Sequence, residues 1–164
     1  LASWTAEQFD PQLNWGDVEW IKKRWGGKLI LKGIMDAEDA RLAVNSGADA
    51  LIVSNHGGRQ LDGAPSSIAA LPAIAEAVGK DIEVWMDGGI RSGQDVLKAR
   101  ALGARGTLIG RSFLYGLGAY GEAGVTRALQ IIQKELDITM AFCGHTNINT
   151  VDRGILLPGT YPLA

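Results

Sequence analysis

Short apolar runs alternate with segments of helical periodicity along this chain. The runs LILKG, ALIVS, EVWMD and GTLIG predict strands near residues 29–33, 50–55, 83–87 and 106–110. The segments around and between them predict helices near residues 15–25, 36–45, 66–78, 93–102 and 119–136. Continuous apolar strands that alternate with helices are typical of a parallel sheet whose outer face is covered.

The predicted helices carry start and stop signals. Three begin with a polar cap that is followed three residues later by an acid, at Asn14–Asp17, Asp36–Asp39 and Ser92–Asp95. Two end at a glycine suited to a left-handed C-terminal cap, Gly47 or Gly103. In the first helix the apolar residues at helical spacing form one stripe, made of Trp15, Val18, Ile21 and Trp25.

A repeat relates two of the strand–helix units. Residues 29–54 and 85–110 align without gaps, and the identical pairs have matching roles at the strand end, in the helix and at the glycine cap. Repeated βα units predict an α/β fold, either a doubly wound sheet or a (βα)₈ barrel. A complete barrel needs about 250 residues. Because only four βα units are visible, this chain would supply about half of a barrel.

Composition restricts the classes of function. The 164 residues, 46% hydrophobic and 21% charged, predict one soluble globular domain over residues 1–164. A net charge of −2 without a basic run argues against a nucleic-acid partner. No apolar run reaches the roughly 18 residues of a membrane span, and no signal peptide is recognisable. The single cysteine, Cys143, excludes an internal disulfide and favours a reducing compartment.

The predicted ends of the last two strands carry glycine and arginine. They read DGGIRSG (residues 87–93) and GRS (residues 110–112). Glycine lets backbone N–H groups approach an anion, and the N-terminus of the following helix adds a favourable dipole. Arg91 and Arg111 would add charge-assisted hydrogen bonds. Either loop alone could be a tight turn with a solvated arginine, but two consecutive loops of this kind favour a phosphate-bearing ligand.

The ends of the first two strands carry the candidate chemistry. Lys32 ends an apolar strand, so its ammonium either meets an anion or strong acceptors there or extends to solvent. In SNHGGRQLDG (residues 54–63), His56 can accept a proton near neutral pH and Arg59 can hold a planar carboxylate. A lone histidine after a strand is often structural, but the neighbouring cations favour a base beside a carboxylate clamp. His145 lies outside the βα pattern, and we interpret it as structural or interfacial.

These motifs resemble a known family. LKGI, SNHGGRQLDG, DGGIRSG, LIGR and the tail MAFCGHTNINTVDRGIL are similar to the FMN-dependent L-2-hydroxy-acid oxidases and dehydrogenases. That family includes glycolate oxidase, the flavin L-lactate dehydrogenases and oxidases, and mandelate dehydrogenase. The resemblance extends from about Gln8 to Leu156, and the SNHGGRQLD segment is its most specific part.

The resemblance implies a role for each candidate residue. It implies FMN as cofactor, no metal, and a flavin contact for Lys32 and Ser54, with Lys32 stabilising the reduced flavin. It implies that His56 is the catalytic base and that His56 and Arg59 bind the substrate, whose carboxylate is held by Arg59. The ribityl chain and phosphate of FMN would be held by Asp87, Gly88, Gly89, Ile90, Arg91, Gly110 and Arg111.

The resemblance also implies that a large part of the enzyme lies outside this sequence. In the family the first half of a (βα)₈ barrel supplies further flavin and substrate contacts. Leu1 falls where the mobile loop after the fourth strand ends, so this chain corresponds to strands five to eight and the carboxyl-terminal helices. The expected partners are the amino-terminal half and, as in a tetramer of the full enzyme, further copies. We expect a cytoplasmic protein, or one held peripherally at the inner membrane through the missing part.

The implied reaction is the oxidation of an L-2-hydroxy acid of the lactate, glycolate or mandelate type to the 2-oxo acid. Hydride transfer and initial removal of the C–H proton both remain open as routes. Oxygen, a quinone or a cytochrome remain open as electron acceptors, although the long tail favours a dehydrogenase. The alternative interpretation is a catalytically incomplete half-barrel that binds FMN or phosphate, or that acts only in assembly.

Overall fold

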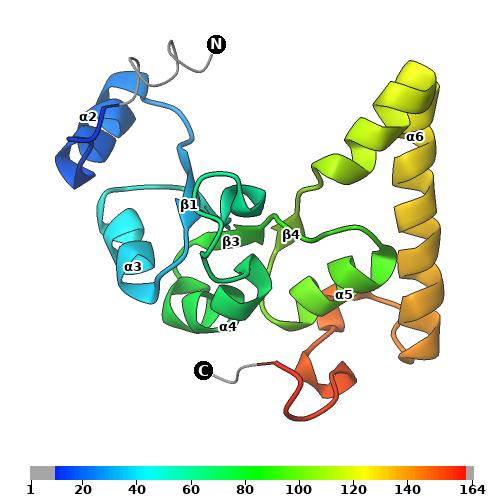
Figure 1. Cartoon of the computed structure of the whole chain (residues 1–164). Coiled ribbons are helices and arrows are strands. Elements are labelled where there is room, and N and C mark those ends of the chain that lie inside the picture. The colour runs from blue at the N-terminus through cyan, green and yellow to red at the C-terminus, as the bar shows by residue number, and fades with distance from the viewer. Residues whose placement is uncertain (1–9, 162–164) are drawn as a thin grey trace.

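The computed structural model describes residues 10–161, and these form a four-stranded parallel sheet with helices between the strands (Figure 1). Leu1 and Gln8, at which the chain and the resemblance begin, lie outside the described residues. The strands are β1 (Ile30–Ile34), β2 (Ala50–Val53), β3 (Glu83–Met86) and β4 (Gly106–Thr107). They lie side by side in chain order. A doubly wound sheet reverses its strand order at a switch point, so the unreversed order favours the partial barrel.

Five helices and three short 3₁₀ turns complete the described part. The helices are α2 (Trp15–Trp25), α3 (Ala37–Asn45), α4 (Ser67–Val78), α5 (Gly93–Ala101) and α6 (Arg111–Phe142). The 3₁₀ turns are η1 (His56–Gly58), η2 (Ile148–Thr150) and η3 (Arg153–Ile155). The four predicted strands and the first four predicted helices are confirmed, although β4 contains two residues where five were predicted.

The predicted caps explain where the helices begin and end. Capping boxes form at Asn14 with Asp17 and at Ser92 with Asp95. Asp36 also caps α3, but its side chain accepts from the backbone N–H of Glu38, and no box forms with Asp39. Beyond α3 and α5 the chain turns at Gly47 (φ 80°) and Gly103 (φ 109°), which are left-handed as predicted.

The core lies between the central strands and the helices α3, α4 and α5. Leu51 and Val53 of β2 are fully buried, as is Leu71 of α4. Each such side chain stabilises the fold by roughly 1.5–3 kcal/mol relative to exposure. On the opposite side of α5, Leu97 packs in a smaller cluster with Leu136 of α6. The packed strands and helices hold the carboxyl ends of the strands in fixed relative positions.

Helix α6 extends beyond its predicted limits. The pattern predicted residues 119–136, whereas the helix runs over Arg111–Phe142 with a break at Tyr120 and Gly121. The break folds the helix into a hairpin (Figure 1). Its arms touch at Gly116 and Gly124, where an added Cβ would overlap the backbone of the opposite arm. The sequence pattern failed here because glycines, which normally disfavour a helix, provide the close approach of the two arms.

Part of the apolar stripe of helix α2 is exposed. Trp15 packs against the core, but Ile21 and Trp25 are 39% and 68% exposed. An ion pair from Lys22 to the Asp49 carboxylate attaches the helix, and Lys28 and the Leu29 backbone N–H, which follow the helix, bind the same carboxylate. Hydrogen bonds from Lys22 and Lys28 and from the Leu29 backbone hold the pKa of Asp49 well below its usual range, and the contact with Asp49 raises the pKa of Lys28.

Candidate functional site

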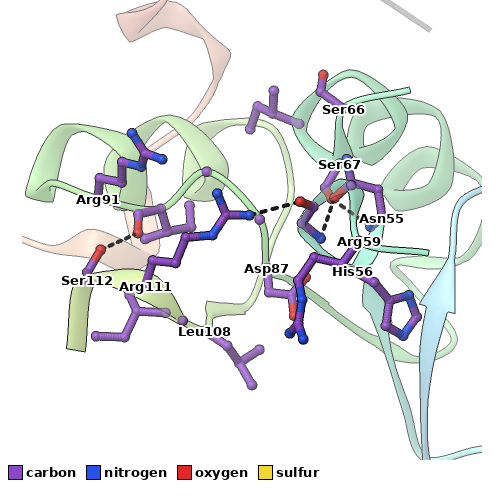
Figure 2. Close-up of a pocket in the computed structure, with 18 of the residues that line it drawn as sticks. Asn55, His56, Arg59, Ser66, Ser67, Asp87, Arg91, Leu108, Arg111 and Ser112 are labelled. Carbon is purple, nitrogen blue, oxygen red and sulfur yellow. Dashed lines mark hydrogen bonds between the residues drawn. The ribbon is translucent and has the colours of Figure 1, made fainter. Parts of the chain in front are cut away.

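A cavity of about 690 Å³ lies at the carboxyl ends of the strands. Almost every residue selected from the sequence lines it, namely Lys32, His56, Arg59, Asp87, Gly88, Gly89, Ile90, Arg91, Gly110 and Arg111. Figure 2 shows His56, Arg59, Asp87, Arg91 and Arg111 around this space. The convergence follows from the parallel sheet, since all four strands end at the same edge.

Ser54 is the exception, because it does not line the cavity. It is 1% exposed, and its hydroxyl accepts hydrogen bonds from Lys32 Nζ (3.0 Å) and from the backbone N–H of His56 (3.1 Å). The Lys32 ammonium also pairs with Asp87 Oδ2 at 3.2 Å. Lys32 lies within β1, two residues before the end of the strand and not at its end as expected. Its ammonium meets strong acceptors, which is one of the two outcomes expected for it. Ser54 links this cation to the backbone of residues 55–59, which we call the histidine loop.

The loop after β2 has an unusual backbone that hydrogen bonds hold in place. His56 is left-handed (φ 55°), as are Gly57 and Gly58. A left-handed conformation costs a non-glycine residue about 1–2 kcal/mol. The backbone N–H of Gly57 donates to Asn55 Oδ1 at 2.9 Å. The imidazole lies against β1, where a Cβ on Gly33 would come within 2.9 Å of His56 Cε1.

The ends of β3 and β4 form the opposite wall of the cavity. Gly88 and Gly89 are left-handed, and a Cβ on Gly89 would meet nothing within 4 Å, so the backbone there is open to an incoming group. Gly110 and Arg111 stand at the N-terminus of α6, where no side chain caps the helix. Open backbone N–H groups, a helix N-terminus and two guanidinium groups together favour an anion such as a phosphate.

Asp87, which lines the cavity, carries a buried acceptor without a donor. Its Oδ2 pairs with Lys32, whereas its Oδ1 is buried and has no hydrogen-bond partner among residues 10–161. A buried carboxylate oxygen without a donor is costly. The Oδ1 atom can therefore accept a hydrogen bond from a hydroxyl-bearing ligand in the cavity.

Three residues that support the site were not selected from the sequence. Asn55 binds the Gly57 N–H and donates to the Pro65 carbonyl at 3.2 Å. Ser67, buried at the start of α4, accepts from the Asn55 backbone N–H at 3.1 Å. Ser112 donates to the Ile90 carbonyl at 3.1 Å and thereby joins the two glycine–arginine strand ends. Asn55 lies inside the SNHGGRQLDG segment and Ser112 inside GRS, so both positions were usable signals, whereas Ser67 gave none.

His145 lies away from the cavity, and residues 10–161 contain neither a metal-binding cluster nor a helix that could span a membrane. His145 follows α6 and does not line the cavity. No cluster of three or more histidine, cysteine or acidic side chains suited to a metal ion occurs within residues 10–161. Over the same range, no helix combines the length and the apolar character that crossing a bilayer requires.

Comparison with known proteins agrees with this geometry. Residues 1–158 match the family described as FMN-dependent dehydrogenase. The chain belongs to this family. Its membership accounts for the partial barrel and makes FMN, the family's cofactor, the group to be tested against the cavity.

Relatives of the FMN-dependent dehydrogenase family cover nearly the whole chain. L-lactate dehydrogenase of Caulobacter vibrioides is 53% identical over 153 residues, which cover 93% of this chain and 40% of that protein. L-lactate dehydrogenase of Pseudomonas syringae pv. syringae is 51% identical over 154 residues, or 94% of this chain and 40% of that protein. This chain therefore spans about 40% of the length of these curated relatives.

Solved structures of mandelate oxidase have the same fold. A complex of that enzyme with benzoyl-formic acid superimposes with a TM-score of 0.84 and 44% identity, covering 90% of this chain and 44% of that one. A mandelate oxidase variant with a monooxide FMN adduct gives a TM-score of 0.84 and 44% identity over 89% of this chain and 46% of that one. The matched portion confirms that this chain forms part of a barrel of the family.

Proposed function

We propose that this chain forms the carboxyl-terminal half of an FMN-dependent enzyme that oxidises an L-2-hydroxy acid to the 2-oxo acid. The observation that carries the proposal is that one cavity holds both an imidazole–guanidinium pair, His56 and Arg59, and the two glycine–arginine strand ends. The names of the relatives, L-lactate dehydrogenase and mandelate oxidase, support a substrate with a hydroxyl group next to a carboxylate.

The residues of the cavity fit FMN. The glycine–arginine strand ends would hold its phosphate, and the partnerless Asp87 Oδ1 would accept a hydrogen bond from a ribityl hydroxyl. Lys32 would place a positive charge beside the flavin ring, fixed by Ser54 and Asp87. FMN, when bound, supplies a two-electron acceptor for the oxidation. The protein's part is then to orient the substrate and to move its proton.

His56 and Arg59 would carry out that part. The Arg59 guanidinium would hold the substrate carboxylate through two parallel hydrogen bonds, which fixes the position of the hydroxyl-bearing carbon. The His56 imidazole would accept the proton that leaves the substrate as the carbon is oxidised. The hydrogen bonds to the backbone of residues 55–59 support this role, because a base acts efficiently only when its position is fixed.

The amino-terminal portion of the barrel would complete the enzyme. Ile30 on the edge strand β1 is 53% exposed, and Trp20 and Trp25 of α2 are 64% and 68% exposed. Exposed apolar side chains beside an open strand edge favour contact with another part of the protein. The roughly 40% coverage of the relatives supports the same interpretation, in which strands one to four close the barrel against β1 and β4.

The visible absorbance of the flavin tests the proposal. The purified chain, alone and together with the amino-terminal portion, would be loaded with FMN and mixed without oxygen with L-lactate, glycolate or L-mandelate. Bleaching by one of these acids supports the enzyme. FMN binding without bleaching in the completed barrel supports the alternative of a binding module. Absence of FMN binding to the completed barrel contradicts the proposal.

A further inference from the structure

Arg91 and Arg111, the arginines that follow β3 and β4, make different contacts. Arg111 Nη2 donates a hydrogen bond to the Gly57 carbonyl oxygen at 2.8 Å, which joins the start of α6 to the histidine loop. The guanidinium of Arg91 makes no such bond within the described residues, and its backbone N–H donates to Asp95. In Figure 2, Arg111 extends toward the loop of Asn55, His56 and Arg59, whereas Arg91 lies on the far side of Arg111 from that loop. Arg111 thus connects the two ends of the cavity.

Gly57 lies in the part of that loop where the backbone conformation depends on outside contacts. It lies next to His56 in a run of three left-handed residues, which need outside support because the conformation is unfavourable for His56. Ser54 and Asn55 bind the N–H groups of His56 and Gly57. Arg111 holds the same peptide segment from its carbonyl side. A change at Arg111 therefore acts on the backbone that carries His56 and, two residues beyond Gly57, Arg59.

A guanidinium can hold two partners at once. It has five N–H donors in one plane, and the bond to Gly57 uses one of them. Arg111 lines the cavity, so its remaining donors are available to an anion there. We propose that Arg111 is a positioning residue that couples the binding of the FMN phosphate to the geometry of the His56–Arg59 loop. This inference rests on the proposed function, because it assumes that FMN occupies the cavity.

Amide hydrogen exchange of residues 56–59 tests the coupling without measuring turnover. In the completed barrel, saturating FMN is expected to slow exchange of the loop about fivefold to tenfold, the factor associated with one net hydrogen bond. Arg111→Lys keeps the charge but lacks the fork that reaches both partners, so FMN should no longer slow the loop. Arg91→Lys is the matched control: it should bind FMN more weakly and still show the slowing at saturation.

Two glycine variants in the loop test the same contact between Arg111 and Gly57. A Cβ on Gly57 would come within 2.9 Å of Arg111 Nη2, whereas a Cβ on Gly58 would meet only Asp62 Oδ1, at 3.7 Å. Both glycines are left-handed, at φ 69° and 72°, so alanine strains the two positions similarly. Because coupling is reciprocal, Gly57→Ala should weaken FMN binding about fivefold to tenfold more than Gly58→Ala.

The outcomes separate this inference from the proposed function. If FMN binds and still slows the loop in Arg111→Lys, or if the two glycine variants bind FMN equally, the coupling is overturned while the proposed function stands. If the completed wild-type barrel binds no FMN, both are overturned. Loss of the slowing in Arg111→Lys, with its retention in Arg91→Lys, supports the coupling.

Discussion

Lys32 and Asp87 meet across the end of strand β2, with Lys32 Nζ 3.2 Å from Asp87 Oδ2. Lys32 belongs to β1 and Asp87 follows β3, so the pair spans the strand between them. Ser54, which follows that middle strand, accepts from the same ammonium. Three successive strand ends are thus joined through one lysine, and the cavity acquires a fixed positive charge beside the free oxygen of Asp87.

Replacing Lys32 tests the importance of that charge. Lys32→Met should lower the reduction potential of bound FMN and slow its reduction by substrate about 10²–10³-fold, because a preorganised charge would be lost. The free energy of unfolding should change by only about 1 kcal/mol or less, since the ammonium is partly exposed. Redox titration and anaerobic stopped-flow absorbance measure both effects. Lys80→Met, at an exposed lysine away from the cavity, is the control; an equal effect of the two variants would contradict the role of Lys32.

Replacing His56 tests the identity of the base. His56→Asn removes the base but keeps a residue type that tolerates a left-handed backbone. Reduction of FMN by substrate should fall about 10²–10⁴-fold while FMN remains bound. His56→Ala should lose the same activity and in addition destabilise the loop by roughly 1 kcal/mol. Substrate reduction at an undiminished rate in both variants would show that another group takes the proton.

Two glycines of α6 test the packing of the hairpin. A Cβ on Gly116 would overlap the backbone of Gly124, whereas a Cβ on Gly118 would meet nothing within 4 Å. Gly116→Ala should lower the free energy of unfolding by about 1–3 kcal/mol through overpacking. Gly118→Ala, two residues away, should raise it by up to about 1 kcal/mol through helix propensity. Urea unfolding followed by circular dichroism would compare them; equal shifts in the midpoint would refute the close contact.

The Asp49 ion pairs predict a dependence of stability on pH. The pKa of Asp49 is lowered in the folded state, so its stabilising contribution is present above the unfolded pKa of about 4 and is lost as the pH falls through the folded value. Asp49→Asn should therefore be less stable than the wild type at pH 7, and the difference should shrink below about pH 4. Thermal unfolding over this pH range measures it. Asp81→Asn, at an exposed position, should show no such convergence.

Much of the fold could be predicted from the sequence because its signals are local. Apolar runs, polar caps and glycine stops act within a few residues, and they located the four strands and the first four helices. The limits of α6 could not be predicted in this way. Gly116 and Gly124 favour the hairpin only through contact with each other, which is a property of the packed structure. For a related reason the spacing of the α2 stripe gives a helical face but does not identify what covers it.

The candidate site could be predicted to a similar extent. Strand-end residues converge in any parallel sheet, so listing them in chain order located the lining of the cavity. Distances between loops could not be obtained from spacing along the chain. The contact between Arg111 and Gly57 joins residues that are 54 positions apart. The buried Ser54 hydroxyl accepts hydrogen bonds from both Lys32 and the His56 backbone. Such contacts depend on the register of neighbouring strands, which sets how far each strand end extends and which the apolar pattern does not encode.

The most direct test is a crystal structure of the completed barrel with FMN and a 2-oxo acid. We expect the FMN phosphate between the Gly88–Arg91 and Gly110–Arg111 segments, and the carboxylate of the oxo acid on Arg59 beside His56. A phosphate bound at His56 and Arg59, or an FMN bound outside this cavity, would contradict this expectation.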